Sequence, residues 1–242
     1  MDEQQVQAIA HEAVKLFWQT RDQQTERQST AGRSDQGARS AVTGGAQMDG
    51  FIDLFAKIVK DTGAPASSIF LKRSVELPGF FRPSKKWDLL VVAGGQLYAA
   101  LEAKSQIGPS FGNNFNNRTE EAIGSATDLW TAYRQGAFNK SAKPWLGYMM
   151  LLEDCPASRA PLRVAEPHFK VFSEFKSASY AQRYEFLLRK LVRERLYDGA
   201  CFLTTESASG LAGGSYQQPA EDLQLMGFIR SLIAHISANF KS

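Results

Sequence analysis

The sequence contains few cysteines and few histidines, and this limits the chemistry that it can support. Its two cysteines, Cys155 and Cys201, lie far apart, so they provide neither a disulfide framework nor a cysteine-based zinc site. Its three histidines occur singly, which argues against a multi-histidine metal centre. Because the chain uses so few thiols, we expect a reducing compartment such as the cytoplasm.

Several targeting signals and catalytic motifs are also missing. The N-terminus has no basic segment followed by an apolar run, so the sequence predicts no signal peptide. No apolar run approaches the roughly 20 residues that span a bilayer, so we expect no membrane partner. GxxxxGK[ST], HExxH and GxSxG are absent, which argues against P-loop nucleotide hydrolysis, zinc-protease chemistry and serine-hydrolase chemistry.

The overall composition is that of an ordinary globular protein. The chain has 242 residues, of which 43% are hydrophobic and 22% charged, which fits one large domain and excludes global disorder. Its formal net charge of +3 is too small to identify a nucleic-acid partner or to exclude one. We expect a single domain over residues 1–242, with an N-terminal helix and polar arm at 1–47 and a core at 48–242.

Residues 19–47 form a polar segment that is nearly free of large apolar side chains. It follows a helix that the spacing of apolar residues predicts over residues 2–21. Segments of this length and composition are either solvated linkers or functional arms. The second interpretation is an arm that becomes ordered on a polyanion through spaced arginines, namely Arg21, Arg27, Arg33 and Arg39.

The rest of the chain alternates between extended and helical patterns. Apolar patterning predicts strands over residues 69–75, 88–92, 96–104, 145–152 and 201–205. It predicts helices over residues 48–61, 118–135, 180–197 and 220–240, with a loop rich in Gly, Pro and Asn at 105–117. A hairpin followed by alternating helices and strands indicates an α/β fold in which helices flank a mixed sheet.

Three charged residues lie at one end of the predicted hairpin. Asp88 opens its first strand, and Glu102 and Lys104 close its second. Charges within apolar strands are costly unless they are paired or exposed at an end. Paired carboxylates supply hard oxygen ligands for Mg²⁺, and a lysine beside such an ion can orient a water or neutralise a reacting phosphate. The alternative is a strand-end salt bridge between Glu102 and Lys104 without a catalytic role.

The register of the hairpin tests this metal site. With a two-residue or four-residue turn centred on Gly94–Gly95, Asp88 lies opposite Leu101 and faces away from Glu102. A three-residue connection, Gly94–Gln96, puts Asp88 opposite Glu102 on the same face. A bulge in one strand has the same effect. We therefore predict the three-residue loop or else a bulge.

A stretch rich in asparagine follows the hairpin. Asparagine pairs with adenine edges in the major groove, and arginine pairs with guanine edges. The alternative is a turn that caps a helix, since asparagine favours both. The candidate base contacts are Asn113, Asn114, Asn116, Asn117 and Arg118. Further on, Lys140 and Lys143 fit either phosphate contacts or a solvated loop.

These segments resemble a known family. The dipeptide Trp87-Asp88, the motif Glu102-Ala103-Lys104 and the run GPSFGNNFNNRTEEAIG over residues 108–124 are similar to XhoI-type type II restriction endonucleases. These enzymes belong to the PD-(D/E)xK nuclease superfamily. The similarity covers nearly the whole chain, and its asparagine-rich run is more specific than its Glu-x-Lys motif. The resemblance implies a restriction-endonuclease-like core with a mixed central sheet flanked by helices.

The resemblance also implies an activity and a site. It implies a Mg²⁺-dependent homodimer that cleaves double-stranded DNA at the palindrome CTCGAG after the first C, leaving 5′-phosphate and 3′-hydroxyl ends. Asp88, Glu102 and the carbonyl of Ala103 correspond to metal ligands, and Lys104 corresponds to the catalytic lysine. Where the superfamily has a Pro-Asp dipeptide, this sequence has Trp87-Asp88. This departure weakens the motif match more than the proposed mechanism, because the proline takes no part in the chemistry.

The resemblance extends to an acidic residue and to partners, and the polar arm adds a separate hypothesis. An extra acidic residue on the helix before the sheet falls on Asp49 in preference to Asp53, which is spaced to pair with Lys57. The polar arm, including Arg39, would wrap DNA and become ordered on binding. The enzyme would work in the bacterial cytoplasm alongside a cognate DNA methyltransferase, without a stable complex between the two.

Three other functions remain open from the sequence. A repair or junction-resolving nuclease can share the fold, because fold does not determine function. A DNA-binding protein without catalysis would use Glu102 and Lys104 only as an ion pair. A protein–protein adaptor would show no salt-dependent affinity for DNA.

Overall fold

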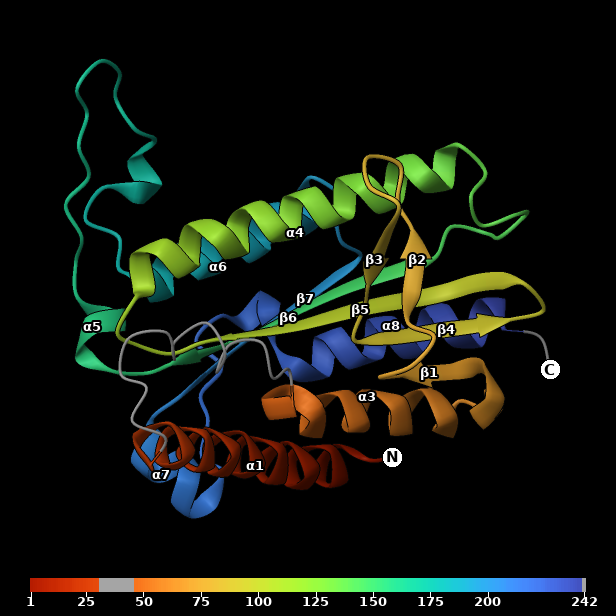
Figure 1. Ribbon diagram of the computed structural model, residues 1–242, viewed down its shortest axis with the longest axis horizontal. Helices are drawn as coiled ribbons and strands as arrows, with labels where there is room; N and C mark the ends of the chain where they lie inside the picture. Colours follow the sequence, from red (N-terminus) through yellow and green to blue (C-terminus); the bar gives the residue numbers. More distant parts are fainter. Residues whose placement is uncertain (31–45, 241–242) are drawn as a thin grey trace.

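A five-stranded mixed sheet forms the centre of the computed structural model, which describes residues 1–30 and 46–240 (Figure 1). The strand order is β1-β4-β5-β6-β7, in which β1, β4 and β5 are antiparallel and β5, β6 and β7 are parallel. The strands are β1 (Ile69–Leu71), β4 (Leu89–Ala93), β5 (Gln96–Gln106), β6 (Trp145–Glu153) and β7 (Gly199–Thr205). The predicted α/β fold is confirmed.

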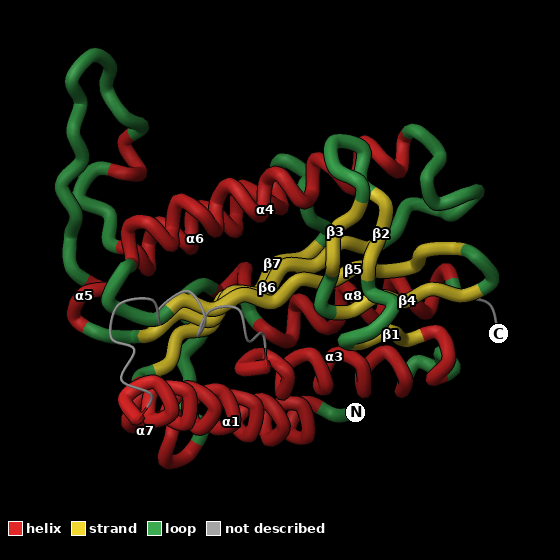
Figure 2. Tube along the Cα trace, in the orientation of Figure 1, coloured by secondary structure: helices red, strands yellow, loops and turns green. Residues whose placement is uncertain are grey.

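Helices cover both faces of this sheet (Figure 2). One face packs against α4 (Phe111–Arg134) and α6 (Tyr180–Arg193). The other packs against α3 (Asp49–Asp61) and α8 (Leu225–Asn239), with α1 (Glu3–Thr30) against α3. Strand side chains alternate between faces, so Ala100 joins the cluster under α4, whereas Leu101 joins the cluster under α3. By the same alternation, Glu102 and Lys104 of β5 face α4.

The strand predicted over residues 69–75 is confirmed only over 69–71, as β1, and it is followed by a small second sheet. It consists of β2 (Glu76–Pro78) and β3 (Ser84–Lys86), and it lies beside α4 (Figure 1). The first strand ends early because Lys72 and Ser74 adopt positive φ angles of 61° and 54°, which strands do not accommodate. The other short elements are η1 (Ala46–Met48), η2 (Ala66–Ser68), α5 (Pro156–Arg159), η3 (Ser173–Phe175), α7 (Ser207–Gly213) and η4 (Glu221–Leu223).

The hairpin of β4 and β5 contains a bulge. Its connection is the two-residue turn Gly94–Gly95, whose φ angles of 56° and 72° suit a tight hairpin turn. The register then shifts by one residue, because Tyr98 is an extra residue on β5. The shift places Asp88 opposite Glu102. The predicted bulge is therefore confirmed, and the predicted three-residue loop is wrong.

The N-terminal helix is longer than the apolar pattern predicted. It continues to Thr30, into the segment interpreted as a polar arm, because glutamine, glutamate and arginine are good helix formers even without an apolar stripe. The remainder of that arm, with Arg33 and Arg39, lies outside the described residues.

The asparagine-rich run is helical, whereas the sequence predicted a loop there. α4 begins at Phe111, so this run forms its first two turns. Phe111 and Phe115 account for the earlier start, since both are buried against the ring of Tyr180 on α6. Tertiary packing thus outweighs the weak helix preference of asparagine.

The remaining predicted elements lie close to their expected positions. The helices at 48–61 and 180–197 and the strands at 145–152 and 201–205 are confirmed as α3, α6, β6 and β7. The closing helix is shorter than predicted, because α8 starts only at Leu225 after the turn η4. Within the described ranges, no helix combines the length and the apolar character needed to cross a membrane.

Candidate active site

Asp88 lies directly before β4, at the end of the hairpin away from the turn. Its backbone N–H donates to the carbonyl of Leu101, and its Oδ2 accepts the N–H of Ala103 at 2.9 Å. Burial raises the pKa of the Asp88 carboxyl, and the ammonium of Lys104 opposes that rise. The hydrogen bond from Ala103 therefore orients the carboxylate, while burial disfavours its ionised form.

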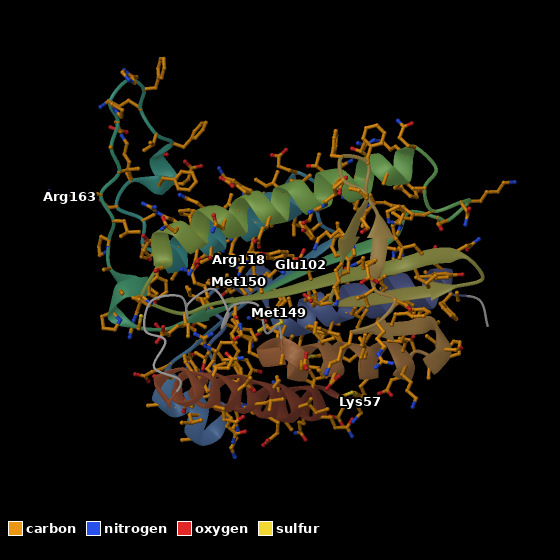
Figure 3. The ribbon with its side chains drawn as sticks, viewed as in Figure 1. Lys57, Glu102, Arg118, Met149, Met150 and Arg163 are labelled. Atoms are coloured by element: carbon orange, nitrogen blue, oxygen red, sulfur yellow. The ribbon has the colours of Figure 1, made fainter. Side chains whose placement is uncertain are left out.

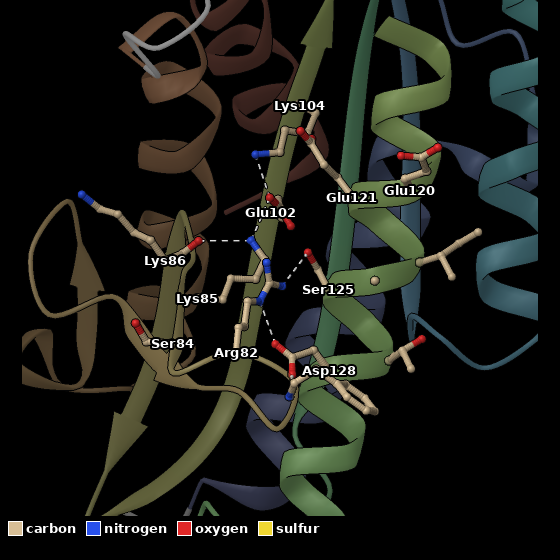
Figure 4. A pocket seen from close by; sticks show the side chains of 14 residues that line it. Arg82, Ser84, Lys85, Lys86, Glu102, Lys104, Glu120, Glu121, Ser125 and Asp128 are labelled. Carbon is tan, nitrogen blue, oxygen red and sulfur yellow. Dashed lines mark hydrogen bonds and ion pairs between the residues drawn. The ribbon is translucent and has the colours of Figure 1, made fainter. Parts of the chain in front are cut away.

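Glu102 lies opposite Asp88 and is only 3% exposed. Its Oε1 accepts hydrogen bonds from two ammonium groups, Lys104 at 2.7 Å and Lys85 at 3.0 Å (Figure 4). Burial alone would raise the pKa of Glu102, but the two lysines outweigh burial and lower it, so the carboxyl stays ionised. Its other oxygen, Oε2, is buried and has no hydrogen-bond partner among the described residues.

Lys104 follows Glu102 on the same face of β5, two residues along. Burial alone would lower the pKa of Lys104, but the carboxylates of Glu102 and Asp88 raise it above its ordinary value of 10.5. With this raised pKa, the ammonium is charged at neutral pH. The side chain is 25% exposed, so it is still accessible from solvent. It can therefore supply a fixed positive charge to a bound anion.

The oxygens at this end of the hairpin fit a divalent metal ion. Glu102 Oε2 is buried without a partner, and the Asp88 carboxylate lies opposite it. The carbonyl of Ala103 points to the same side of β5 as that of Leu101, because strand backbone groups alternate with a period of two. These are hard oxygen donors of the kind that Mg²⁺ takes, with waters and substrate oxygens completing its coordination.

Asp49 does not join these two carboxylates. It lies in the first turn of α3 and forms an ion pair with Lys72 at 2.8 Å. Lys72 follows β1, whose last residue Leu71 pairs with Leu89, so Asp49 lies toward the Asp88 end of the sheet. Within residues 1–30 and 46–240, no three His, Cys, Asp or Glu side chains are close enough together to hold a metal.

A cleft of about 810 Å³ opens beside Glu102, between the β2–β3 hairpin and α4 (Figure 4). The hairpin and β5 line one side with four cationic side chains, Arg82, Lys85, Lys86 and Lys104. The α4 side carries Glu120, Glu121, Ser125 and Asp128. Cationic side chains contact phosphates in protein–DNA interfaces, so this wall can hold a DNA backbone at the carboxylates.

The tip of the β2–β3 hairpin is attached to α4 by the buried carboxylate of Asp128. Its Oδ1 accepts the backbone N–H groups of Phe80 at 2.7 Å and Phe81 at 2.8 Å, and its Oδ2 accepts Nε of Arg82 at 2.7 Å. A Cβ at Gly79 would collide with the same carboxylate, so the contact requires glycine there. These contacts hold the hairpin tip against α4, beside the cleft.

The asparagine-rich run and Arg118 face different surroundings. Asn113, Asn116 and Asn117 are exposed on α4, and Asn114 is half-buried. The Arg118 side chain is only 16% exposed, pairs with Glu121 at 2.5 Å, and acts electrostatically on Lys104. Figure 3 shows Arg118 under α4, on the side of the helix that faces the sheet and Glu102. The fold thus brings Arg118 toward the carboxylates and leaves most of the asparagines open to solvent.

Lys140 and Lys143 lie at the far end of the hairpin. In their loop, Asn139 donates to the carbonyl of Gly95 at 3.1 Å, so the loop packs against the β4–β5 turn. With a rise of roughly 3.3 Å per residue, that turn is about 20 Å along β5 from Glu102. Lys143 also pairs with Asp198. The structure therefore does not bring these lysines to the carboxylates.

Sequence reasoning missed two neighbours of Glu102. Lys85 reaches it from β3, and Tyr148 pairs with it across β5 and β6. The Tyr148 hydroxyl is buried without a hydrogen-bond partner among the described residues, and burial, followed by the Glu102 charge, raises its pKa well above 10.0. Only the strand order and the position of the small sheet reveal these contacts, and neither has a local sequence signal.

Comparisons with known proteins identify the family of the chain. The chain matches a family model described as restriction endonuclease XhoI over residues 27–218. It is 51% identical over 212 residues to the type II restriction enzyme BstVI of Geobacillus stearothermophilus, covering 86% of this chain and 94% of that protein. It is 47% identical over 186 residues to the type II restriction enzyme XhoI of Xanthomonas vasicola, covering 76% and 74%.

A third relative is the type II restriction enzyme AbrI of Azospirillum brasilense. It is 51% identical over 162 residues, which cover 66% of this chain and 72% of that protein. No solved structure matches the chain significantly.

Proposed function

Since the chain belongs to the XhoI family of type II restriction endonucleases, which are site-specific deoxyribonucleases, we propose that it cuts both strands of the palindrome CTCGAG. Cleavage after the first C leaves 5′-phosphate and 3′-hydroxyl ends. Mg²⁺ is the proposed cofactor, because type II restriction enzymes generally depend on a divalent metal. Double-stranded DNA is the substrate of the family. The family assignment disfavours the repair-nuclease, non-catalytic and adaptor alternatives.

One observation supports this proposal above the others. Glu102 and Lys104 of β5 line the cleft that carries the cationic side chains, and Asp88, directly before β4, lies opposite Glu102. Glu102 Oε2 has no hydrogen-bond partner among the described residues, which is costly for a buried carboxylate unless another group binds it. We assign Asp88, Glu102 and the Ala103 carbonyl as the metal ligands, and Lys104 as the catalytic lysine.

The reaction is hydrolysis by in-line displacement at phosphorus. Water attacks, the bond from phosphorus to the 3′ oxygen breaks, and the products carry a 5′-phosphate and a 3′-hydroxyl. The bound metal would supply Lewis-acid stabilisation of the charge that develops on the phosphate. The Lys104 ammonium, held by Glu102 at 2.7 Å, is a fixed donor at the same phosphate and orients the attacking water.

DNA recognition is assigned to the start of α4. The exposed Asn113, Asn116 and Asn117 are the proposed base contacts, with the half-buried Asn114 beside them. Arg118 faces the site, so we assign it to a phosphate next to the scissile one. Asp49 remains a proposed additional acidic group, reached through water or by movement of Lys72. Arg39, Lys140 and Lys143 are proposed as backbone contacts outside the cleft.

A homodimer follows from the symmetry of the target. A palindrome presents the same cut site on each strand, and a twofold dimer presents one site to each. The cognate DNA methyltransferase protects the same sequence in the host without a stable complex between the two proteins.

The decisive experiment is digestion of a plasmid of known sequence with the purified protein and Mg²⁺. We expect discrete fragments whose sequenced ends map to CTCGAG. Lys104→Ala should retain binding to a CTCGAG duplex and lose cleavage by at least 100-fold, a typical loss for such a group.

A matched control is Lys57→Ala. Lys57 is an exposed lysine of α3, on the opposite side of the sheet from α4 (Figure 3). It should cut as fast as the unaltered protein. A smear of fragments, or discrete cutting at another sequence, would overturn the proposed specificity, and equal activity of Lys104→Ala would overturn its assigned role.

A further inference from the structure

Lys85 is a second lysine on the proposed metal carboxylate, and neither the family motif nor the hairpin of β4 and β5 supplies it. Its ammonium donates to Glu102 Oε1 at 3.0 Å and to the carbonyl of Lys86 at 3.1 Å. It also lies 4.4 Å from the centroid of the Trp87 ring. Only 11% of the side chain is exposed, so the charge is held in place next to a buried carboxylate.

The charges around Glu102 balance without a metal. Asp88 and Glu102 contribute two negative charges, and Lys85 and Lys104 contribute two positive ones. The nearby charge of Arg118 is offset by its ion-pair partner Glu121. A divalent ion placed on these carboxylates would raise the local charge by two. In a buried site such an excess is strongly unfavourable, because neighbouring like charges are poorly screened. Metal binding therefore needs another anion, or the departure of one ammonium.

The two lysines differ in what holds them. Lys104 belongs to the same central strand as Glu102, two residues along. Lys85 belongs to the separate β2–β3 sheet and reaches Glu102 only through its flexible four-carbon side chain. It lines the same cleft as Arg82 and Lys86, where the DNA backbone is proposed to lie.

We propose that Lys85 is a resident counter-ion of Glu102 that opposes divalent-metal binding until a DNA phosphate enters the cleft and takes over its ammonium. The proposal rests on the proposed function, because it needs Glu102 as a metal ligand and DNA in the cleft. Lys85 is thus a positioning residue that acts through Glu102. It makes tight metal binding depend on bound DNA.

The test measures Mn²⁺ binding to the full-length protein without DNA, by the electron paramagnetic resonance signal of free Mn²⁺. We expect Lys85→Met to bind Mn²⁺ at least tenfold more tightly than the unaltered protein. The control is Lys86→Met, which removes the charge of a neighbouring lysine whose side chain points away from Glu102 (Figure 4). This variant should bind Mn²⁺ as tightly as the unaltered protein does. Adding Asp88→Asn to Lys85→Met should abolish this gain in Mn²⁺ affinity. That result would show that the ion binds at the Asp88 carboxylate.

A second measurement tests the exchange with DNA. In single-turnover cleavage of a CTCGAG duplex, the Mg²⁺ concentration for half-maximal rate should differ less than threefold between Lys85→Met and the unaltered protein. This follows because Lys85 has already left Glu102 in the complex. If the half-maximal Mg²⁺ concentration instead falls tenfold, Lys85 stays on Glu102 and the proposal is wrong.

Unchanged Mn²⁺ affinity in Lys85→Met without DNA would also overturn the proposal. Lys85→Gln serves as a second variant, and thermal unfolding of each variant identifies any that fails to fold. If the unaltered protein cuts at CTCGAG while both Lys85 variants bind Mn²⁺ as it does, this inference alone fails. If the unaltered protein does not cut there, the proposed function fails first.

Discussion

Glu102 shows how a charged residue is accommodated within a central strand. It is only 3% exposed. One of its oxygens pairs with two ammonium groups, those of Lys85 and Lys104, which belong to two different sheets. A buried carboxylate without such partners would be strongly destabilising. Its remaining oxygen is not satisfied by a hydrogen bond from any of the described residues. The unsatisfied oxygen of Glu102 therefore lies where metal binding is proposed to occur.

Asp88→Asn should raise the stability of the metal-free protein while abolishing cleavage. Burial raises the pKa of Asp88, so the folded state disfavours the charged carboxylate more than the unfolded state does. The charge on Asp88 at pH 7 is therefore destabilising. Asparagine keeps an acceptor for the N–H of Ala103 without that charge. We expect the free energy of unfolding at pH 7 to increase by about 1 kcal/mol, measured by urea denaturation with a chelator present.

The sign of this effect depends on pH. A raised folded-state pKa gives stability that is fully present below the unfolded pKa and is lost as pH rises through the folded one. The advantage of Asp88→Asn should therefore shrink as the pH falls toward 4. Asp53→Asn, at an exposed position of α3, should change stability by less than about 0.5 kcal/mol at either pH. A loss of stability in Asp88→Asn at pH 7 would contradict the expectation.

At the scale of elements, the β2–β3 hairpin is placed by one residue of α4. Asp128 accepts two backbone N–H groups at the hairpin tip and the side chain of Arg82. The hairpin in turn carries Lys85 to Glu102. A helix, a small sheet and the central sheet are thus linked through two buried carboxylates, and the cleft lies between them.

Asp128→Asn should destabilise the fold by about 2 kcal/mol, since hydrogen bonds to a charged acceptor are lost or weakened. The matched control is Asp222→Asn, which also removes a carboxylate bound to an arginine, Arg189 at 2.8 Å. The Asp222 side chain is 51% exposed, so this change should cost less than about 1 kcal/mol. Chemical denaturation compares the two, and equal losses would contradict a special role for Asp128.

Acid should reveal the same contact in the unaltered protein. Burial alone would raise the pKa of Asp128, but the N–H of Phe81, the Arg82 side chain and the N–H of Phe80 outweigh it and lower the pKa below 3.8. A lowered folded-state pKa gives stability that is present above the unfolded pKa and is lost as pH falls through the folded one. Stability should therefore decrease below about pH 4, and less steeply in Asp128→Asn.

For the whole molecule, two layers of helices enclose the sheet, while one segment extends beyond them. Residues 160–178 project from the body near α5 (Figure 1). Phe169 and Phe172 in this segment are 88% and 75% exposed. The core instead consists of the two clusters on either side of the sheet, where Phe202 of β7 is fully buried.

This arrangement predicts a contrast between two identical substitutions. Phe169→Ala should change the free energy of unfolding by less than about 0.5 kcal/mol, because the side chain has little buried surface to lose. Phe202→Ala should cost about 3–5 kcal/mol, because it leaves a cavity in the core. Urea denaturation measures both. A large loss in Phe169→Ala would contradict this arrangement.

The sequence by itself predicted the cluster of Asp88, Glu102 and Lys104 and most of the elements. Asp88, Glu102 and Lys104 stand out because charges within apolar strands are costly, and the family resemblance implies their roles. For Asp88 and Glu102 to meet across the glycine turn, their spacing requires a bulge or an odd loop. The long amphipathic helices and buried strands followed from local periodicity, which tertiary context reinforced.

Only the tertiary structure decided which residues surround that group. Lys85 reaches Glu102 because the β2–β3 sheet folds over β5, and Tyr148 is its neighbour because β6 lies next to β5. The start of α4 at Phe111 depended on burial against Tyr180. Each of these contacts joins residues far apart in the chain, and local sequence patterns do not encode such contacts because their free energy arises only when separate elements pack together.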